Sequence, residues 1–373
     1  MREEYAFLLS LLIFWVLIYV LSKLLFLDKY GLQVKPLFIK YNSGAFKKIL
    51  YKYSSKWRGM WKIFSYISVF LGLGLILFAI IFLSLNLAEI LSFGGHEAAI
   101  TPIIPGVTLS LYWLPYFLVS VVIAVFIHEA AHGILALSEG VNVKAAGVLL
   151  LAIFPGGFVE IDEKELTRLP YASRMKIFSA GASLNMLAGL IVFLLLSSLF
   201  IQNPSGIIVL EVLEGGPLNR AGIGRWDVIY ALNGTPIHTY QDLTSFMSNV
   251  KPNNRLVLST SKGNITIVAA PNPNDPHRAI IGIVSPILTY YPSRLGLGFF
   301  WDIQIYLTLN WLLLILINVA VFNMLPIPLL DGDNFIQCLL EKVGVKGKVL
   351  RKILNALSIF LIAANIFLSF RIK

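Results

Sequence analysis

The sequence predicts a polytopic α-helical membrane protein with about six transmembrane helices, a membrane-associated β-hairpin and an inserted β-rich domain. Of its 373 residues, 57% are hydrophobic and only 13% are charged, whereas soluble chains carry roughly a quarter charged residues. This composition excludes a soluble globular protein, because the surplus apolar surface needs lipid around it. The single cysteine, Cys338, excludes an internal disulfide and a zinc site built from cysteines.

Six apolar runs of about 20 residues are candidate membrane spans. They lie near residues 6–26, 64–88, 113–137, 177–201, 299–321 and 353–370. The first run lacks a small-residue cleavage site, so we expect a retained helix and not a signal peptide.

The basic residues predict the orientation of these spans. The net charge is +10, the loop 28–62 has nine lysine and arginine residues beside the single acid Asp28, and the loop 89–112 has none. Basic loops stay in the cytoplasm. We therefore expect both termini outside the cell and residues 202–288 also outside. Because topology explains the basic balance, we expect no nucleic-acid partner.

Residues 202–288 interrupt the apolar pattern. They are rich in Gly, Pro and Asn, and they contain short runs typical of β-strands. These runs are Ile207–Leu213, Val228–Leu232, Leu256–Ser259 and Asn264–Ala269. The segment is therefore predicted to be an inserted soluble β-rich domain.

A second β-structure is predicted between the third and fourth spans. Residues Val143 to Ile161 are too apolar for a solvated loop and are divided by Pro155-Gly156-Gly157. This pattern favours a β-hairpin with a tight turn at the glycines. The alternative is a cytoplasmic hairpin that rests on the membrane surface.

The third span contains the pattern H-E-x-x-H. His128 and His132 are four residues apart, so they share one helix face and can bind one zinc ion through two imidazoles. Glu129 lies one residue further round, where it can take a proton from water and return it to a leaving amine. Ionisable residues within a span are costly and usually functional. A chance match is the alternative, and soluble zinc hydrolases carry the same pattern.

The fifth span ends in a second motif. Pro326 and Pro328 break the helix, and Asp331-Gly332 predicts a turn. The third and fifth spans run in the same direction, which places His128 and Asp331 at one depth, roughly 10 Å inside the cytoplasmic boundary. The alternative is an exit turn with a solvated aspartate.

Together the two motifs resemble the site-2 protease family of intramembrane zinc metalloproteases. The resemblance covers about residues 113 to 345 and rests on the patterns His128-Glu129-x-x-His132 and Asn323-x-x-Pro326-x-Pro328-x-x-Asp331-Gly332. It implies that Asp331, and not Asp333, is the third protein ligand of one Zn²⁺ ion. It also implies that Glu129 is catalytic and that Asn323 helps to hold the oxyanion.

The fourth span carries a further, weaker match to the family. In Ala180-Gly181-Ala182-Ser183-Leu184-Asn185, alanine stands where the family usually has proline. We carry over Asn185 alone, as a catalytic-site residue in contact with the substrate or the oxyanion. The alternative is a buried amide that joins helices. In the family, a re-entrant β-structure at the place of residues 143–161 lies beside the active site and accepts an extended substrate at its edge.

The inserted domain resembles a PDZ domain of the bacterial protease-associated type. The matching residues are Gly215–Ile223, Asp227–Ile229, Asn233-Gly234 and the closing strand Ile281-Gly282-Ile283. Trp226 stands where glycine is common. Such domains bind chain ends or extended peptides, and the alternative is a size filter over the active site.

These inferences divide the chain into five parts. Residues 1–112 hold two N-terminal helices and the basic loop, 113–201 the zinc motif and hairpin, 202–288 the extracytoplasmic PDZ-like domain, 289–345 the Asp-Gly motif, and 346–373 the last helix.

The predicted function is a zinc endopeptidase of the cell membrane that performs regulated intramembrane proteolysis. Its partners would be single-span membrane proteins and the lipid bilayer, and its active site would lie toward the cytoplasmic side. A catalytically silent adaptor that holds clients through the PDZ-like domain is the alternative, but the intact Glu129 argues against it. A zinc transporter is a further alternative, but it would need more acids along the spans.

Overall fold

The computed structural model describes residues 2–93, 100, 102–105, 108–284, 286–343 and 347–371. The chain forms two compact units, one of Met1–Ile191 with Trp311–Lys373 and the other of Val192–Asn310. The expected boundaries at 112, 201, 288 and 345 stay predictions.

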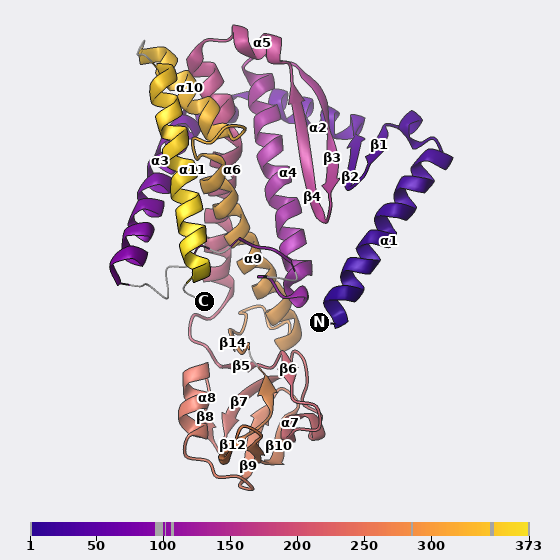
Figure 1. Ribbon diagram of the computed structural model, residues 1–373, viewed down its shortest axis with the longest axis vertical. Helices are drawn as coiled ribbons and strands as arrows, with labels where there is room; N and C mark the ends of the chain where they lie inside the picture. Colours follow the sequence, from indigo (N-terminus) through magenta and orange to yellow (C-terminus); the bar gives the residue numbers. More distant parts are fainter. Residues whose placement is uncertain are drawn as a thin grey trace. The chain divides into compact units, whose positions relative to one another are not determined.

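Long apolar helices dominate the first unit (Figure 1). They are α1 (Arg2–Leu24), α3 (Arg58–Phe93), α4 (Leu114–Ser138), α6 (Tyr171–Leu199), α9 (Phe299–Asn323) and α11 (Gly347–Arg371), of which α6 and α9 continue into the second unit. Among the described residues, five helices are long and apolar enough to cross a bilayer, and the apolar stretch Leu9–Leu24 of α1 is shorter. The chain is therefore a multi-pass helical membrane protein. The count of six and the orientation stay predictions.

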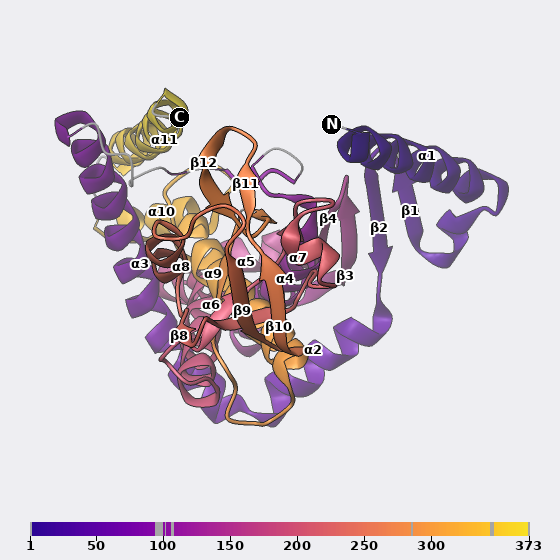
Figure 2. The same cartoon turned by 90° about the horizontal axis from the view of Figure 1, so that it is seen from below.

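A four-stranded antiparallel sheet also belongs to this unit. Its order is β1 (Leu32–Lys35), β2 (Phe38–Asn42), β3 (Val143–Leu151) and β4 (Phe154–Ile161). Figure 2 shows the four strands side by side, and in Figure 1 β4 lies along α4. The β-structure predicted for Val143–Ile161 is thus present as β3 and β4, with Val148 opposite Gly157.

Two details of this region differ from the predictions. Pro155, Gly156 and Gly157 lie inside β4 and not in a turn, because the chain reverses at Ala152, which has a φ of 54°. The basic segment 28–62 is not a plain loop, since it contains β1, β2 and the helix α2 (Gly44–Lys56). Its strand β2 pairs with β3, which lies about a hundred residues later in the chain. No local pattern in the sequence reveals this pairing.

The chain between α9 and α10 (Asp331–Val343) carries the second motif. Pro326 and Pro328 follow the end of α9, as predicted, but Asp331 and Gly332 begin α10 instead of forming a turn. A Cβ atom on Gly332 would lie 2.1 Å from the carbonyl oxygen of Met324. The glycine is therefore explained by a close backbone approach and not by turn geometry.

One apolar core fixes this segment against the neighbouring helices. It joins α3, α6, α9 and α10 through Leu75, Ala182, Ala320, Met324 and Phe335, all of them buried. The start of α10 is consequently held beside α6, which matters for the placement of Asp331.

The second unit contains the inserted domain. Its main sheet runs in the order β10 (Gly263–Val268), β9 (Arg255–Thr260), β7 (Val228–Leu232), β5 (Gly206–Ile208) and β14 (Leu288–Tyr290), and β8 (Thr235–Pro236) pairs with β7. Two small ribbons pair β6 (Glu211–Val212) with β13 (Ile283–Val284) and β11 (Ala270–Asn272) with β12 (Asp275–Ile280). Its two helices are α7 (Pro217–Arg220) and α8 (Tyr240–Met247). The predicted β-rich character is confirmed.

Buried aliphatic side chains form the core of this domain. They include Ile207, Leu218, Ile229 and Leu258, each fully buried. The hairpin between β7 and β8 turns at Asn233-Gly234, where both residues have positive φ. Trp226 also adopts a positive φ, 73°, at the position where the resemblance expects glycine. The PDZ identity stays a prediction.

Candidate metal centre

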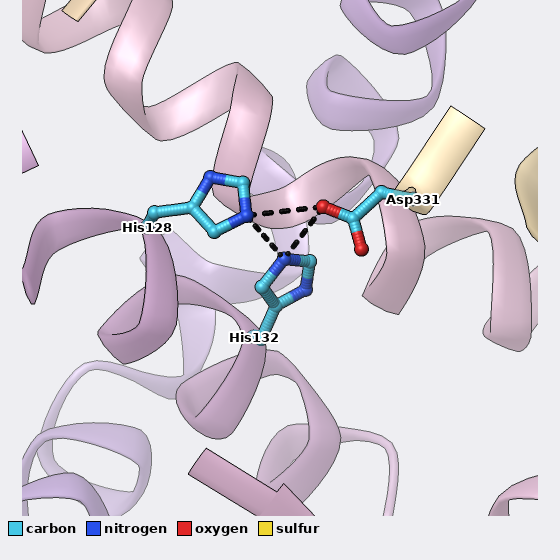
Figure 3. A group of neighbouring side chains, drawn as sticks. All are labelled: His128, His132 and Asp331. Atoms are coloured by element: carbon cyan, nitrogen blue, oxygen red, sulfur yellow. Dashed lines mark hydrogen bonds and ion pairs between the residues drawn. The ribbon is translucent and has the colours of Figure 1, made fainter. Parts of the chain in front are cut away.

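His128 and His132 are presented by α4. The helix begins with proline in its first turn, and the four-residue spacing places both rings on one face. Both side chains are buried, at 6% and 8% exposure. In Figure 3 the two rings and the carboxylate of Asp331 point toward one another.

The ligand atoms of these three residues form a nearly equilateral triangle. The Nε2 atom of His128 lies 3.0 Å from Oδ2 of Asp331, and Nε2 of His132 lies 3.1 Å from the same oxygen. The two Nε2 atoms are 3.0 Å apart. Tetrahedral zinc with bonds of about 2 Å places its ligand atoms roughly 3.3 Å apart. The spacing therefore suits one zinc ion.

Hydrogen bonding supports the same conclusion. The Nδ1–H group of His132 donates to the carbonyl oxygen of Ile177 at 2.7 Å. In the neutral ring, this donation leaves Nε2 with a lone pair that faces the Asp331 carboxylate. Two acceptors cannot satisfy each other, whereas a cation between them would satisfy both. His128, Asp331 and His132 are thus able to hold a metal ion.

Gly181 on α6 provides the space that the two rings occupy. A Cβ atom at this position would lie 2.4 Å from Nε2 of His132 and 2.6 Å from Nδ1 of His128. No alanine fits there unless the rings move, because real Cβ contacts are not this short. Gly181 belongs to the fourth-span pattern, but nothing in the sequence marks it as a neighbour of the two histidines.

Glu129 and Asn323 line the same cavity as the three ligands. This cavity has a volume of about 320 Å³ and also includes Val159 of β4. The Oε2 atom of Glu129 accepts a hydrogen bond from the backbone N–H group of Val159 at 2.9 Å. A carboxylate, three metal-ligand candidates and one strand edge therefore share a single cavity. Backbone groups such as the Val159 N–H leave no sequence signal, so this partner was not anticipated.

Three other acids near the two motifs, Asp333, Glu160 and Asp162, have different partners. Asp333 is 3% exposed and receives two hydrogen bonds from Arg351, at 2.7 and 2.6 Å. The Oε2 atom of Glu160 lies 3.7 Å from Nζ of Lys40. Asp162 caps the N-terminus of α5 (Glu163–Arg168). Only Asp331 of the four faces the two histidines.

Asn185 lies one helical turn beyond Gly181 and is fully buried. Neither its Oδ1 nor its Nδ2 atom has a hydrogen-bond partner among the described residues. Unpartnered buried amides are uncommon in folded proteins. The structure gives the position of Asn185, and its assignment as a substrate or oxyanion contact stays a prediction.

A family model for peptidase family M50 matches residues 116–367. An uncharacterized protein of Methanocaldococcus jannaschii is 29% identical over 271 residues, which cover 67% of this chain and 64% of the relative. A membrane-bound transcription factor site-2 protease homolog of Arabidopsis thaliana is 30% identical over 200 residues, which cover 52% of this chain and 39% of the relative. A Clostridium perfringens protein whose name includes the words zinc metalloprotease is 27% identical over 170 residues, which cover 43% of this chain and 49% of the relative.

The chain thus spans less than two thirds of the length of each of these relatives. A solution structure from Geobacillus thermodenitrificans matches 22% of the chain at 24% identity with a TM-score of 0.20.

Proposed function

This chain belongs to peptidase family M50, and we propose that it is an intramembrane zinc metalloprotease that cleaves single-span membrane proteins within or next to the bilayer. The resemblance to the site-2 proteases is confirmed by the family match and by the name of the Arabidopsis relative. One observation carries the proposal for this chain. The ligand atoms of His128, His132 and Asp331 meet beside Glu129 in one cavity of a membrane protein.

The chemistry divides between the ion and the protein. A bound zinc ion would polarise the scissile carbonyl and lower the pKa of water. Glu129 would take the proton from the attacking water and deliver it to the leaving amine. Asn323, in the wall of the same cavity, would donate its amide N–H to the oxyanion. Both histidines are buried, and their low-dielectric surroundings would strengthen these interactions.

Strand β4 is the proposed binding edge for the substrate. Because Val159 donates its N–H group to Glu129 and not to β3, this part of the edge faces the cavity. A carbonyl oxygen of an extended substrate could accept the hydrogen bond from the same N–H group, so that the substrate is added to β4 as a further strand. Glu129 would then be released toward the scissile bond. Helical peptide bonds are shielded by their own hydrogen bonds, so an unwound substrate is required.

The inserted domain is proposed to be a PDZ-like filter outside the cell. The basic segment 28–62 supports the cytoplasmic placement of that loop and hence the outer placement of residues 202–288. The domain connects the span before it with α9, which carries Asn323. It would therefore restrict substrates that have bulky outer segments. A silent adaptor is less favoured, because the residues needed for hydrolysis are intact.

Cleavage of a single-span reporter protein in proteoliposomes tests the proposed function. Glu129→Gln should lower the rate about a thousandfold while one zinc ion per chain remains, because Glu129 does not contribute to the ligand triangle. The matched control is Glu163→Gln, which removes an exposed carboxylate on α5 and should leave the rate unchanged. A chelator should abolish cleavage by the unaltered protein. Unchanged cleavage by Glu129→Gln would contradict the proposal.

A further inference from the structure

A basic cavity lies where three spans end in the first unit. It has a volume of about 350 Å³ and is lined by residues at the N-terminus of α3, the C-terminus of α4 and the second turn of α6. Its lining includes Arg58, Lys62, Lys176, Glu139 and Trp61. Because Arg58 and Ser138 are terminal residues of their spans, the cavity lies at the level where helices leave the apolar layer.

The charges in this cavity are unbalanced. Lys176 is held by Glu139, with 2.9 Å between Nζ and Oε1, and its ammonium group also lies 4.5 Å from the centre of the Tyr66 ring. Arg58 and Lys62 are exposed, and neither has an ion-pair partner among the described residues. Three cations against one carboxylate give the cavity a formal charge of +2. Such a cavity is suited to an anion.

The surroundings indicate that the anion is part of a lipid. Trp61 is 7% exposed, and its Nε1–H group donates to the carbonyl oxygen of Tyr53 at 3.0 Å, which fixes one wall. From Lys62, an exposed stripe of Tyr66, Phe70, Leu73 and Leu77 continues along α3. Their spacing of three and four residues keeps them on one helix face. A cationic end therefore leads directly into an apolar surface within a span.

We propose that this cavity binds the phosphate group of an anionic membrane lipid whose acyl chains lie along the exposed face of α3. Basic pockets between transmembrane helices recognise anionic head groups by charge. Here the arginine and lysine side chains would donate charge-assisted hydrogen bonds to the phosphate oxygens. The head group would bridge α3 with the ends of α4 and α6.

Lipid binding to the full-length protein tests this inference without a measurement of activity. The purified protein in phosphatidylcholine nanodiscs would be compared with the same protein in nanodiscs that also contain phosphatidylglycerol. Retained lipid would be measured by native mass spectrometry, and unfolding by a thermal melt. We expect phosphatidylglycerol to be retained and to raise the unfolding temperature. Arg58→Gln with Lys62→Gln should weaken this binding roughly 25-fold, since each basic side chain contributes about fivefold.

A matched pair of substitutions separates a specific site from general attraction. Lys48→Gln with Lys52→Gln changes the charge equally on α2, outside the cavity, and should leave phosphatidylglycerol binding unchanged. Equal losses in both double variants would overturn the proposal. Lys62→Gln alone, the milder change, should weaken binding about fivefold. It keeps the test decisive if the double variant does not fold.

Free phosphate provides the remaining comparison. Inorganic phosphate and glycerol phosphate, added to the protein in phosphatidylcholine nanodiscs, should not reproduce the stabilisation, because they lack chains for the face of α3. Equal stabilisation by these soluble anions would identify a phosphate site and overturn the assignment of a lipid.

Discussion

His132 and Asp331 are 199 residues apart in the chain, yet their ligand atoms lie 3.1 Å apart. In the inserted domain, by contrast, every described strand pairs with another strand between residues 206 and 290. The metal centre therefore depends on how distant membrane helices pack, whereas the β-rich domain contains its own pairing partners and core. We therefore expect small changes in helix packing to damage the proposed metal centre, and larger changes in the domain to leave it intact.

Loss of Asp331 should have the largest effect. Asp331→Ala removes the carboxylate that both histidines face, so we expect loss of zinc and a fall in reporter cleavage of about a thousandfold or more. Metal analysis and the cleavage rate would be measured on the same sample. Asp333→Asn is the control, since that carboxylate is bound to Arg351, and it should keep the zinc. Full zinc in Asp331→Ala would disprove the ligand assignment.

A single methyl group on α6 should have the next largest effect. Gly181→Ala places a carbon atom within 2.6 Å of both imidazole rings, so the rings must move and zinc affinity should fall by roughly ten- to a hundredfold. The control is Gly74→Ala in α3, where a Cβ atom meets nothing within 4 Å. Competition with a zinc-binding dye would measure both affinities. Equal affinities would mean that the α4–α6 contact is not critical.

Removal of most of the β-rich domain should spare the metal centre. Replacing residues 205–285 by a short flexible linker should leave zinc content unchanged, because the domain provides none of the proposed ligands. We expect the unaltered protein to cleave reporters with bulky outer segments poorly, and the shortened protein to cleave them faster. If the shortened protein keeps its zinc but no longer cleaves short reporters, the domain recruits substrates instead of filtering them.

The smallest expected effect is a pH-dependent change within the domain. The N–H groups of Thr239 and His238 donate to Asp242, and they lower the pKa of this carboxyl group below its ordinary 3.8. A lower pKa in the folded state means that the carboxylate stabilises α8 fully above pH 3.8. This stabilisation disappears as the pH falls further through the folded value.

Hydrogen exchange of the α8 amides in the full-length protein would measure this effect. Protection should decrease in acid, and Asp242→Asn should remove the pH-dependent part. Asp275→Asn in β12 alters another carboxyl group of the same unit and should preserve the acid-dependent loss. Identical pH profiles for Asp242→Asn and the unaltered protein would contradict the role of the capping carboxylate.

The sequence predicted the parts of the metal centre that depend on local patterns. The spacing of His128 and His132 follows directly from helix geometry, and the prolines mark the end of α9. Asp331 and Asp333 could be distinguished only by resemblance, because both follow the same proline turn. The tertiary structure distinguishes them, because Arg351 of α11 donates hydrogen bonds to the Asp333 carboxylate while the Asp331 carboxylate faces the histidines.

Features made by distant partners could not be predicted from the sequence. Strand β2 lies in a lysine-rich segment, which suggests a loop until its pairing with β3 is known. The turn at Ala152 has no glycine or proline at its positive-φ position, whereas Pro155-Gly156-Gly157 has the composition of a turn but lies in a strand. The alternating runs of the inserted domain were easier to interpret, because alternation is a local pattern that does not depend on which strands pair.

The carbonyl group that orients His132 belongs to Ile177, and every amino acid at position 177 would supply the same oxygen atom. The Ile177 side chain is buried and needs only to fill apolar space, whereas Gly181, one turn later, must have no side chain at all. Two neighbouring positions on α6 thus contribute to the proposed metal centre, and we expect them to differ in their tolerance to mutation. In a library of variants, position 177 would accept several aliphatic residues while position 181 would accept a single one. The contribution of α6 to the proposed site would then be seen in the library as a position that accepts only glycine.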